Sequence, residues 1–215
     1  MKNKLSILLF ILLNLLNMGA LSDFKYNKDN FELAEIYMKD KSEFIKNGIK
    51  FQYKVNNNIN DEALKVKKYI TKNMTENYTS IGENEFKSFN KDFNINIKLW
   101  NKSNYTYVEI ILLNSNNKYT SLDLKRMLKG LDTNTVYLEK QYFSYYKGKL
   151  SSCNKEIKEE LIKKSGIEKE TILEISNGYA GVGSLRDDEK VNFAFTNYDT
   201  GSYVIIGTPI IFETY

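Results

Sequence analysis

Residue types that build many active sites are scarce in this chain. Its 215 residues include no histidine and one cysteine, Cys153. Without histidine, the chain can form neither a Ser-His-Asp triad nor a histidine-containing zinc site. A lone cysteine forms no internal disulfide, so the core must hold without one. The inventory excludes histidine-based catalysis and leaves Cys153 without a histidine base, which favours a free thiol at that position.

Arginine is also scarce, since only Arg126 and Arg186 accompany the lysines. The formal net charge is +4, from 31 basic and 27 acidic residues. Leaving out Lys2 and Lys4, which lie in a segment that we expect to be removed, gives 29 − 27, or +2. Proteins that bind nucleic acids favour the planar fork of arginine and a basic surface. The composition therefore disfavours a nucleic-acid partner.

The N-terminus has the pattern of an export signal. Two lysines precede an apolar run at residues 5–16, and small residues follow at Ala20 and Ser22. This order is typical of a secretory signal peptide, here cleaved after Ser22. An uncleaved anchor is the alternative, although a spanning helix needs about 20 apolar residues. We expect residues 1–22 to be a signal peptide or anchor, and the protein to be extracytoplasmic, either secreted or membrane-tethered.

The rest of the chain alternates helical and strand patterns. Helices are expected at residues 29–46, 60–72, 121–131 and 154–164, and strands at 49–55, 78–89, 93–100, 105–113, 136–146, 171–175, 179–185, 191–198 and 203–212. This order predicts a single domain, residues 23–215, in which an N-terminal helix precedes two pseudo-repeats, about 47–132 and 133–215. Because strands follow one another in runs, we expect an α+β fold with one curved antiparallel sheet and helices on one face.

Glycines mark expected breaks between these elements. Gly48 is expected to end the first helix, and Gly148 to form a turn after the strand at 136–146. The glycines within residues 178–183 follow a strand, as a phosphate-binding loop would. Their spacing is not G-x-G-x-x-G and no helical pattern follows, so we expect a bend between strands.

The chain ends on an apolar strand that contains its only proline, Pro209. Proline cannot donate a ladder hydrogen bond, so this position must be an edge, a bulge or a strand start. The motif Gly207-Thr208-Pro209-Ile210 stands close to an acidic and aromatic C-terminus, Glu213 and Tyr215. With the signal-like start and the order of elements, this motif resembles the YwmB-like family of extracytoplasmic bacterial proteins.

The resemblance implies a TATA-box-binding-protein-like fold, in which two β-α-β(3-4)-α units form a saddle, and a setting in the cell envelope. In the family pattern an acid directly precedes the final tyrosine, whereas Thr214 intervenes here. The family assigns no catalytic residue, binding residue or cofactor.

Aromatic residues are the first candidate site. Trp100, Tyr105, Tyr107 and Tyr145 lie on expected strands, and alternate residues of a strand face opposite sides of a sheet. Some of these rings should lie on the face without helices, as a stacking surface for sugar rings, peptide or nucleobases. Packing within the core is the alternative.

Carboxylates are the second candidate site. Asp187, Asp188 and Glu189 stand in a row, with Asp123, Asp132 and Glu139 elsewhere. Pairs among them could serve acid-base chemistry or bind calcium, or they could lie in solvated turns. Ser152 and Lys155 match S-x-x-K, but the partner motifs of penicillin-recognising enzymes are missing, which favours helix capping.

These patterns favour a non-enzymatic binding or scaffolding protein of the cell envelope, with no cofactor and an envelope protein or polymer as its partner. Nucleic-acid binding through the saddle and carboxylate-based hydrolysis of wall glycans are the alternatives. An exposed aromatic sheet face would favour the first, a steep salt dependence of duplex binding by residues 23–215 the second and two facing acids in a cleft the third.

Overall fold

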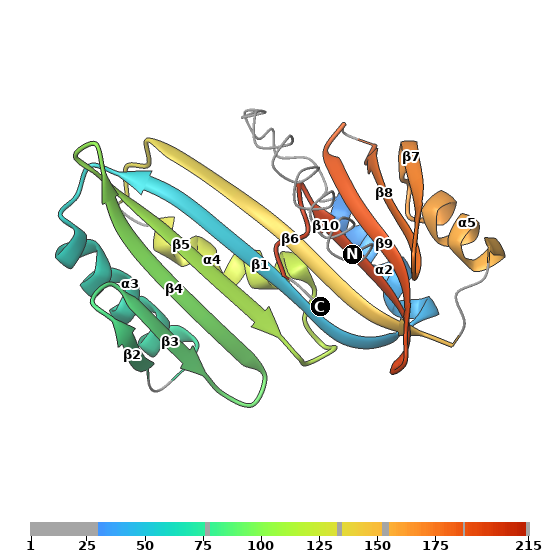
Figure 1. Cartoon of the computed structure of the whole chain (residues 1–215). Coiled ribbons are helices and arrows are strands. Elements are labelled where there is room, and N and C mark those ends of the chain that lie inside the picture. Colours follow the sequence, from blue (N-terminus) through green and yellow to red (C-terminus); the bar gives the residue numbers. More distant parts are fainter. Residues whose placement is uncertain (1–29, 76–77, 133–134, 152–154, 187, 214–215) are drawn as a thin grey trace. The chain divides into compact units, whose positions relative to one another are not determined.

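The computed structural model describes residues 30–75, 78–132, 135–151, 155–186 and 188–213 (Figure 1). It confirms the predicted α+β class: ten strands form an antiparallel sheet in the order β2-β3-β4-β5-β1-β6-β10-β9-β8-β7. The chain divides into two compact units. Unit 2 is Lys46–Phe143, and unit 1 is made of Ser144–Tyr215 with the segment that ends at Ile45. The expected signal segment lies outside the described residues.

Unit 2 combines a meander of strands with two α-helices and a short 3-10 helix. Its strands are β1 (Glu43–Val55), β2 (Tyr78–Gly82), β3 (Glu85–Phe89), β4 (Phe93–Lys102) and β5 (Tyr105–Asn114), and its helices are α3 (Ile59–Asn73), α4 (Ser121–Lys129) and the short 3-10 helix η2 (Gly130–Asp132). Neighbouring strands pair antiparallel, in the order β2-β3-β4-β5-β1. The run expected at residues 78–89 is therefore a hairpin of two strands.

One face of the unit 2 strands carries its core. Ile49 and Phe51 of β1 are fully buried, as are alternate residues of β4 and β5. They pack in one cluster with Val66 of α3 and Leu124 and Leu128 of α4. Both helices therefore cover the same face. We call the opposite side of β1, β3, β4 and β5 the open face of unit 2.

Unit 1 repeats this strand order. It contains β6 (Glu139–Leu150), α5 (Lys155–Lys164), β7 (Glu168–Ile175), β8 (Gly178–Ser184), β9 (Lys190–Tyr198) and β10 (Gly201–Thr208), with strand order β6-β10-β9-β8-β7. In each unit the first strand neighbours the fifth, followed by the fourth, third and second. The described helices include none long and apolar enough to cross a membrane.

The second helix of unit 1 is α2 (Asn30–Lys41), which precedes β1 in the chain. Phe31, Ala34 and Met38 recur at helical spacing and are completely buried. They share a cluster with buried residues of α5, β6, β9 and β10, including Phe193 and Val204. The N-terminal helix thus supplies half of the helical cover of unit 1, a role that its position in the sequence does not indicate.

The segment after β10 covers part of the other face of unit 1. Tyr145, Ile205 and Ile211 form a small buried cluster against Phe212. The strand expected to reach residue 212 therefore ends at Thr208, which precedes Pro209 in a cis peptide bond. A Cβ on Gly207 would lie 2.7 Å from the Ile210 carbonyl oxygen, so the chain turns back closely at the predicted motif.

Two predicted glycine breaks are wrong because these glycines lie inside long strands. The first helix ends at Lys41, and Gly48 lies in β1, where a Cβ would come within 2.8 Å of the Leu112 carbonyl oxygen on β5. Gly148 lies in β6, where a Cβ would collide with Ser42 Oγ. Both glycines are needed for close packing and not for a turn.

β8 (Gly178–Ser184) confirms the strand expected at residues 179–185, so the glycine-rich bend expected at residues 178–183 is wrong. A Cβ on Gly181 would collide with the ring of Phe193, so glycine makes room for a core aromatic of the neighbouring strand. Gly178 has a φ of 147°, which an L side chain rarely adopts.

Candidate functional site

Three of the four predicted aromatic residues lie together on the open face of unit 2. Tyr107 of β5 stands opposite Trp100 of β4 on one side and Lys54 of β1 on the other. Tyr105 lies two residues before Tyr107 and so shares its face, while the intervening Thr106 is buried. We call Trp100, Tyr105, Tyr107 and Lys54 the aromatic row.

The aromatic row is packed and only half-buried. The rings of Trp100 and Tyr107 stack, with their centroids 5.6 Å apart and their planes 10° from parallel. Lys54 Nζ lies 4.5 Å from the centre of the Tyr105 ring and 5.7 Å from that of Tyr107, within cation–π range. These contacts hold the three rings in fixed positions while part of each stays open to solvent.

Charges beside the aromatic row are balanced. Lys54 Nζ lies 2.9 Å from Glu139 Oε1, and this hydrogen bond raises the pKa of Lys54. Glu109 accepts a 2.5 Å hydrogen bond from Gln52 and lies 3.8 Å from Lys50 Nζ. Burial lowers the pKa of Lys50, whereas the charge of Glu109 acts in the opposite direction. Lys50 and Lys54 therefore each have an acidic neighbour.

Tyr145 does not belong to the aromatic row. Its side chain is completely buried in unit 1 with Ile205 and Ile211, and its ring centroid lies 5.6 Å from that of Phe212. The alternation of residues in β6 could not reveal this, because the C-terminal segment that covers Tyr145 is distant in the sequence. Its predicted place in an exposed surface is wrong.

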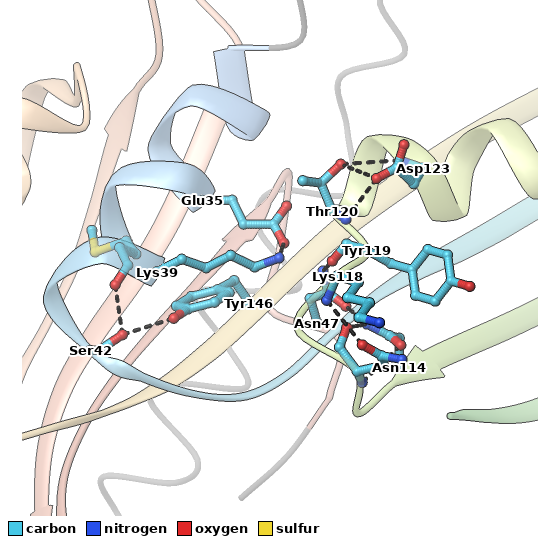
Figure 2. A network of polar contacts seen from close by, with 12 residues as sticks. Glu35, Lys39, Ser42, Asn47, Asn114, Lys118, Tyr119, Thr120, Asp123 and Tyr146 are labelled. Atoms are coloured by element: carbon cyan, nitrogen blue, oxygen red, sulfur yellow. Dashed lines mark hydrogen bonds and ion pairs between the residues drawn. The ribbon is translucent and has the colours of Figure 1, made fainter. Parts of the chain in front are cut away.

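The predicted carboxylates have separate structural roles. Asp123 forms a capping box with Thr120, which replaces the expected cap Ser121 (Figure 2). Partial burial acts to raise the pKa of Asp123, but hydrogen bonds from the Thr120 backbone and hydroxyl and the nearby Arg126 lower it overall. Asp188 pairs with Lys169 at 2.8 Å on an exposed surface.

Other predicted positions do not form a site among the described residues. Ser152, Cys153 and Asp187 and the side chain of Asp132 lie outside the described part of the chain. Within that part, no group of three or more acidic or cysteine side chains could hold a metal ion.

A buried asparagine network in unit 2 was not predicted. Asn114 Nδ2 donates to Asn47 Oδ1 and to the Asn116 carbonyl oxygen, both at 2.7 Å, and Asn47 Nδ2 donates to the Tyr119 carbonyl oxygen at 2.9 Å (Figure 2). These bonds fix the loop between β5 and α4. The only signal in the sequence is the polar run that follows β5, which reads as an ordinary loop.

A second polar contact, within unit 1, fixes the end of α2. Ser42 Oγ donates to the Met38 carbonyl oxygen at 2.7 Å, so its oxygen accepts from the Tyr146 hydroxyl at 2.8 Å (Figure 2). Burial raises the pKa of Tyr146 to about 12, so the hydroxyl stays protonated and can donate this bond. The contact is structural and places no reactive group at a surface.

Comparisons with known proteins provide no assignment. No family model matches the chain, and no curated protein matches it. Among solved structures, the chain is similar to DynU16, a protein described as belonging to the dynemicin biosynthetic locus, with 9% identity over 75% of this chain and 86% of that chain. The TM-score is 0.23, so the likeness carries no argument about fold or function.

Proposed function

We propose that the protein is a non-enzymatic binding protein of the cell envelope that holds a glycan chain against the aromatic row. The observation that carries this proposal is the stacked, half-buried Trp100–Tyr107 pair on a sheet face that no described helix of unit 2 covers. Indole and phenol rings combine a flat apolar surface with a polar edge, which suits the apolar faces and hydroxyl edges of sugars.

Charge favours a neutral or weakly charged sugar over a polyanion. A nucleic-acid site needs lysines and arginines that are free to neutralise successive phosphates. Here Lys54 and Lys50 already face Glu139 and Glu109. Gln52 and Glu109 lie on the same face and could offer hydrogen-bond groups to sugar hydroxyls.

The test uses Trp100 as its reporter, because it is the only tryptophan of the chain. Titration of the purified protein with chitohexaose, a neutral N-acetylglucosamine hexamer, should change its fluorescence and saturate. Tyr107→Ala removes the stacking partner but keeps the reporter. Loss of about 1 kcal/mol of ring contact should weaken binding about fivefold.

Tyr198→Ala is the matched control, since Tyr198 is a surface tyrosine of unit 1 with 38% of its area exposed. It should bind chitohexaose like the unmodified protein. Equal weakening by both substitutions, or no saturable binding to chitohexaose or to soluble wall glycan fragments, would refute the glycan site. Duplex DNA binding with a steep salt dependence would support the nucleic-acid alternative instead.

The proposal includes an extracytoplasmic location and a saddle of the kind found in the YwmB-like family. The location is supported by the signal-like N-terminal sequence. The saddle is supported by the same strand order in both units and by the two helices that each unit packs against its core. Fold analogy alone assigns no function, so the location needs its own experiment.

Protease treatment of intact source cells without their outer wall, combined with the N-terminal mass, tests the location. Digestion from outside, or release of a chain that begins at Asp23, is the expected result. Protection with Met1 retained would contradict export. Wall-glycan hydrolysis is the remaining alternative, and Asp123, Glu139 and Asp188 give it no support, because each has a capping or basic partner.

A further inference from the structure

Unit 1 has an open cavity of about 520 Å³ whose wall is formed by one side of α2 and by the end of α5. Ligand pockets usually fall in the range of about 300–1,000 Å³. All of its lining residues belong to unit 1, so it is separate from the aromatic row.

The α2 side of the cavity is apolar where a surface helix is expected to be polar. Leu33 and Ile36 are 47% and 50% exposed and line the cavity, together with Tyr37. They lie on the opposite side of α2 from Phe31 and Met38, which are buried in the core. The helix is therefore apolar on two sides, and only one of them is needed for the fold.

The ring of Tyr37 is held in place at this wall. Its hydroxyl donates a 2.7 Å hydrogen bond to Glu160 Oε1 of α5. Partial burial, this hydrogen bond and the negative charge of Glu160 raise the pKa of Tyr37 to about 12. The hydroxyl stays protonated at neutral pH, so this hydrogen bond links α2 to α5.

The α5 side supplies cations and a hydroxyl. Gly166, two residues after the end of α5, has a φ of 71°, in the left-handed region. The side chain of Arg186 lies against this glycine, with Nε 3.3 Å from where a Cβ would be. Lys164 lines the same wall. Ser165 also lines the cavity and is only 5% exposed, and its Oγ has no hydrogen-bond partner in the described part of the chain. Buried hydroxyls normally have a partner, so this one points to a ligand.

We propose that this cavity binds the carboxyl end of a short apolar peptide. Arg186 and Lys164 hold the terminal carboxylate, with Ser165 Oγ as an additional donor. Apolar side chains of the peptide rest on Leu33 and Ile36. A guanidinium recognises a carboxylate through two parallel hydrogen bonds, which gives this end its selectivity.

The distribution of polar groups favours a peptide over a fatty acid. Asn30 and Asp40 line the cavity at the two ends of the apolar stretch of α2. They are ten residues apart, which corresponds to about 15 Å along a helix, the length of roughly four extended residues. Peptide N–H and C=O groups could hydrogen-bond to the Asn30 amide and to the Asp40 carboxylate, which also lies 3.7 Å from Lys41 Nζ, whereas an acyl chain offers no polar group along its length.

Calorimetric titration with two forms of one tetrapeptide tests the proposal. Ala-Leu-Ala-Leu with a free carboxylate should bind at least about tenfold more tightly than the same peptide with a C-terminal amide, as expected for a charge-assisted hydrogen-bonded pair. Arg186→Gln should abolish this preference. Arg126→Gln, at the only other arginine, which lies on α4 of unit 2, should retain it.

The apolar wall has its own pair of variants. Ile36→Ser should weaken binding of both peptides about fivefold, whereas Leu64→Ser, at a residue that is 67% exposed on α3, should not. Both sites are exposed, so folding should survive, and unchanged thermal melting verifies this.

Three results would overturn the proposal. These are equal affinity for the two peptides or no binding of either, tighter binding of myristate than of the free peptide, and displacement of the peptide by millimolar acetate. The second would assign an acyl-chain site and the third a simple anion site. None depends on the glycan experiment, because the two sites share no residue.

Discussion

Glu62 should be one of the most sensitive positions for the stability of unit 2. Its carboxylate is 1% exposed at the start of α3 and accepts hydrogen bonds from Tyr53 Oη at 2.8 Å and Asn57 Nδ2 at 2.8 Å. Lys65 Nζ lies 3.2 Å away and is partly exposed. The carboxylate thus joins the first turn of α3 to β1 and to the loop between them.

The expected cost follows from the groups that would lose their partner. Removing one member of a buried, charge-assisted set costs about 3–5 kcal/mol, so Glu62→Ala should lower the free energy of unfolding by that amount. Glu62→Gln keeps the shape but turns an amide N–H₂ towards a donor, and should cost about 1–3 kcal/mol. Tyr53→Phe leaves Asn57 and Lys65 in place and should cost about 1–2 kcal/mol.

Urea denaturation of the single variants and of the Tyr53→Phe/Glu62→Gln double variant measures these values and their coupling. Asp61→Asn is the matched control: it neutralises an exposed acid in the same helical turn and should cost less than about 1 kcal/mol, the helix-dipole contribution alone. If the costs of Glu62→Gln and Asp61→Asn are the same, or if the two substitutions at Tyr53 and Glu62 are simply additive, the reasoning is wrong.

Three further predictions concern stability. Gly48→Ala should lower the free energy of unfolding by about 1–3 kcal/mol, because the new Cβ would press on the backbone of β5, whereas Gly82→Ala, with its nearest neighbour at 3.6 Å, should cost less. Asn114→Ala should lower the free energy of unfolding by about 2–3 kcal/mol, because it breaks the buried asparagine network. Asn94→Ala, at an exposed position of β4, should lower it much less, and urea denaturation measures the difference. The pKa of Asp123 is lowered in the folded state, so its stabilising contribution is present above about pH 4 and is lost as the pH falls through the folded-state pKa. The free energy of unfolding, measured between pH 5 and 2, should therefore depend less on pH in Asp123→Asn than in the unmodified protein. An identical pH dependence would contradict this.

The fold class could be predicted because it depends on local periodicity. Alternation in β1 and β5 and helical spacing in α3 are properties of short windows. The bounds of α3 and β5 lie within one residue of the expected positions, whereas β1 begins at Glu43, six residues before its expected start. The predicted breaks at the glycines within strands are wrong for a physical reason. Gly48 and Gly148 are required by atoms of Leu112 and Ser42, which are distant in the sequence, and no local pattern distinguishes such a glycine from one in a turn.

The candidate binding residues also divide into those whose position follows from local alternation and one whose burial depends on a distant segment. Trp100, Tyr105 and Tyr107 share a face because of alternation and strand register, which the pattern of β4 and β5 contains. Tyr145 has the same local pattern, but the residues that follow β10 bury it. Strand alternation reports the two sides of a sheet. It does not report which side a later segment covers.

α2 is the clearest case in which a local pattern does not show which side of an element is buried. Its apolar residues form two stripes on opposite sides of the helix, so the sequence does not indicate which stripe faces the core. The structure assigns Phe31, Ala34 and Met38 to unit 1, although β1, the next element of the chain, lies mainly in unit 2. Among the described residues the core uses only that stripe, and Leu33 and Ile36 on the other side of α2 remain available to the peptide that we propose for the cavity.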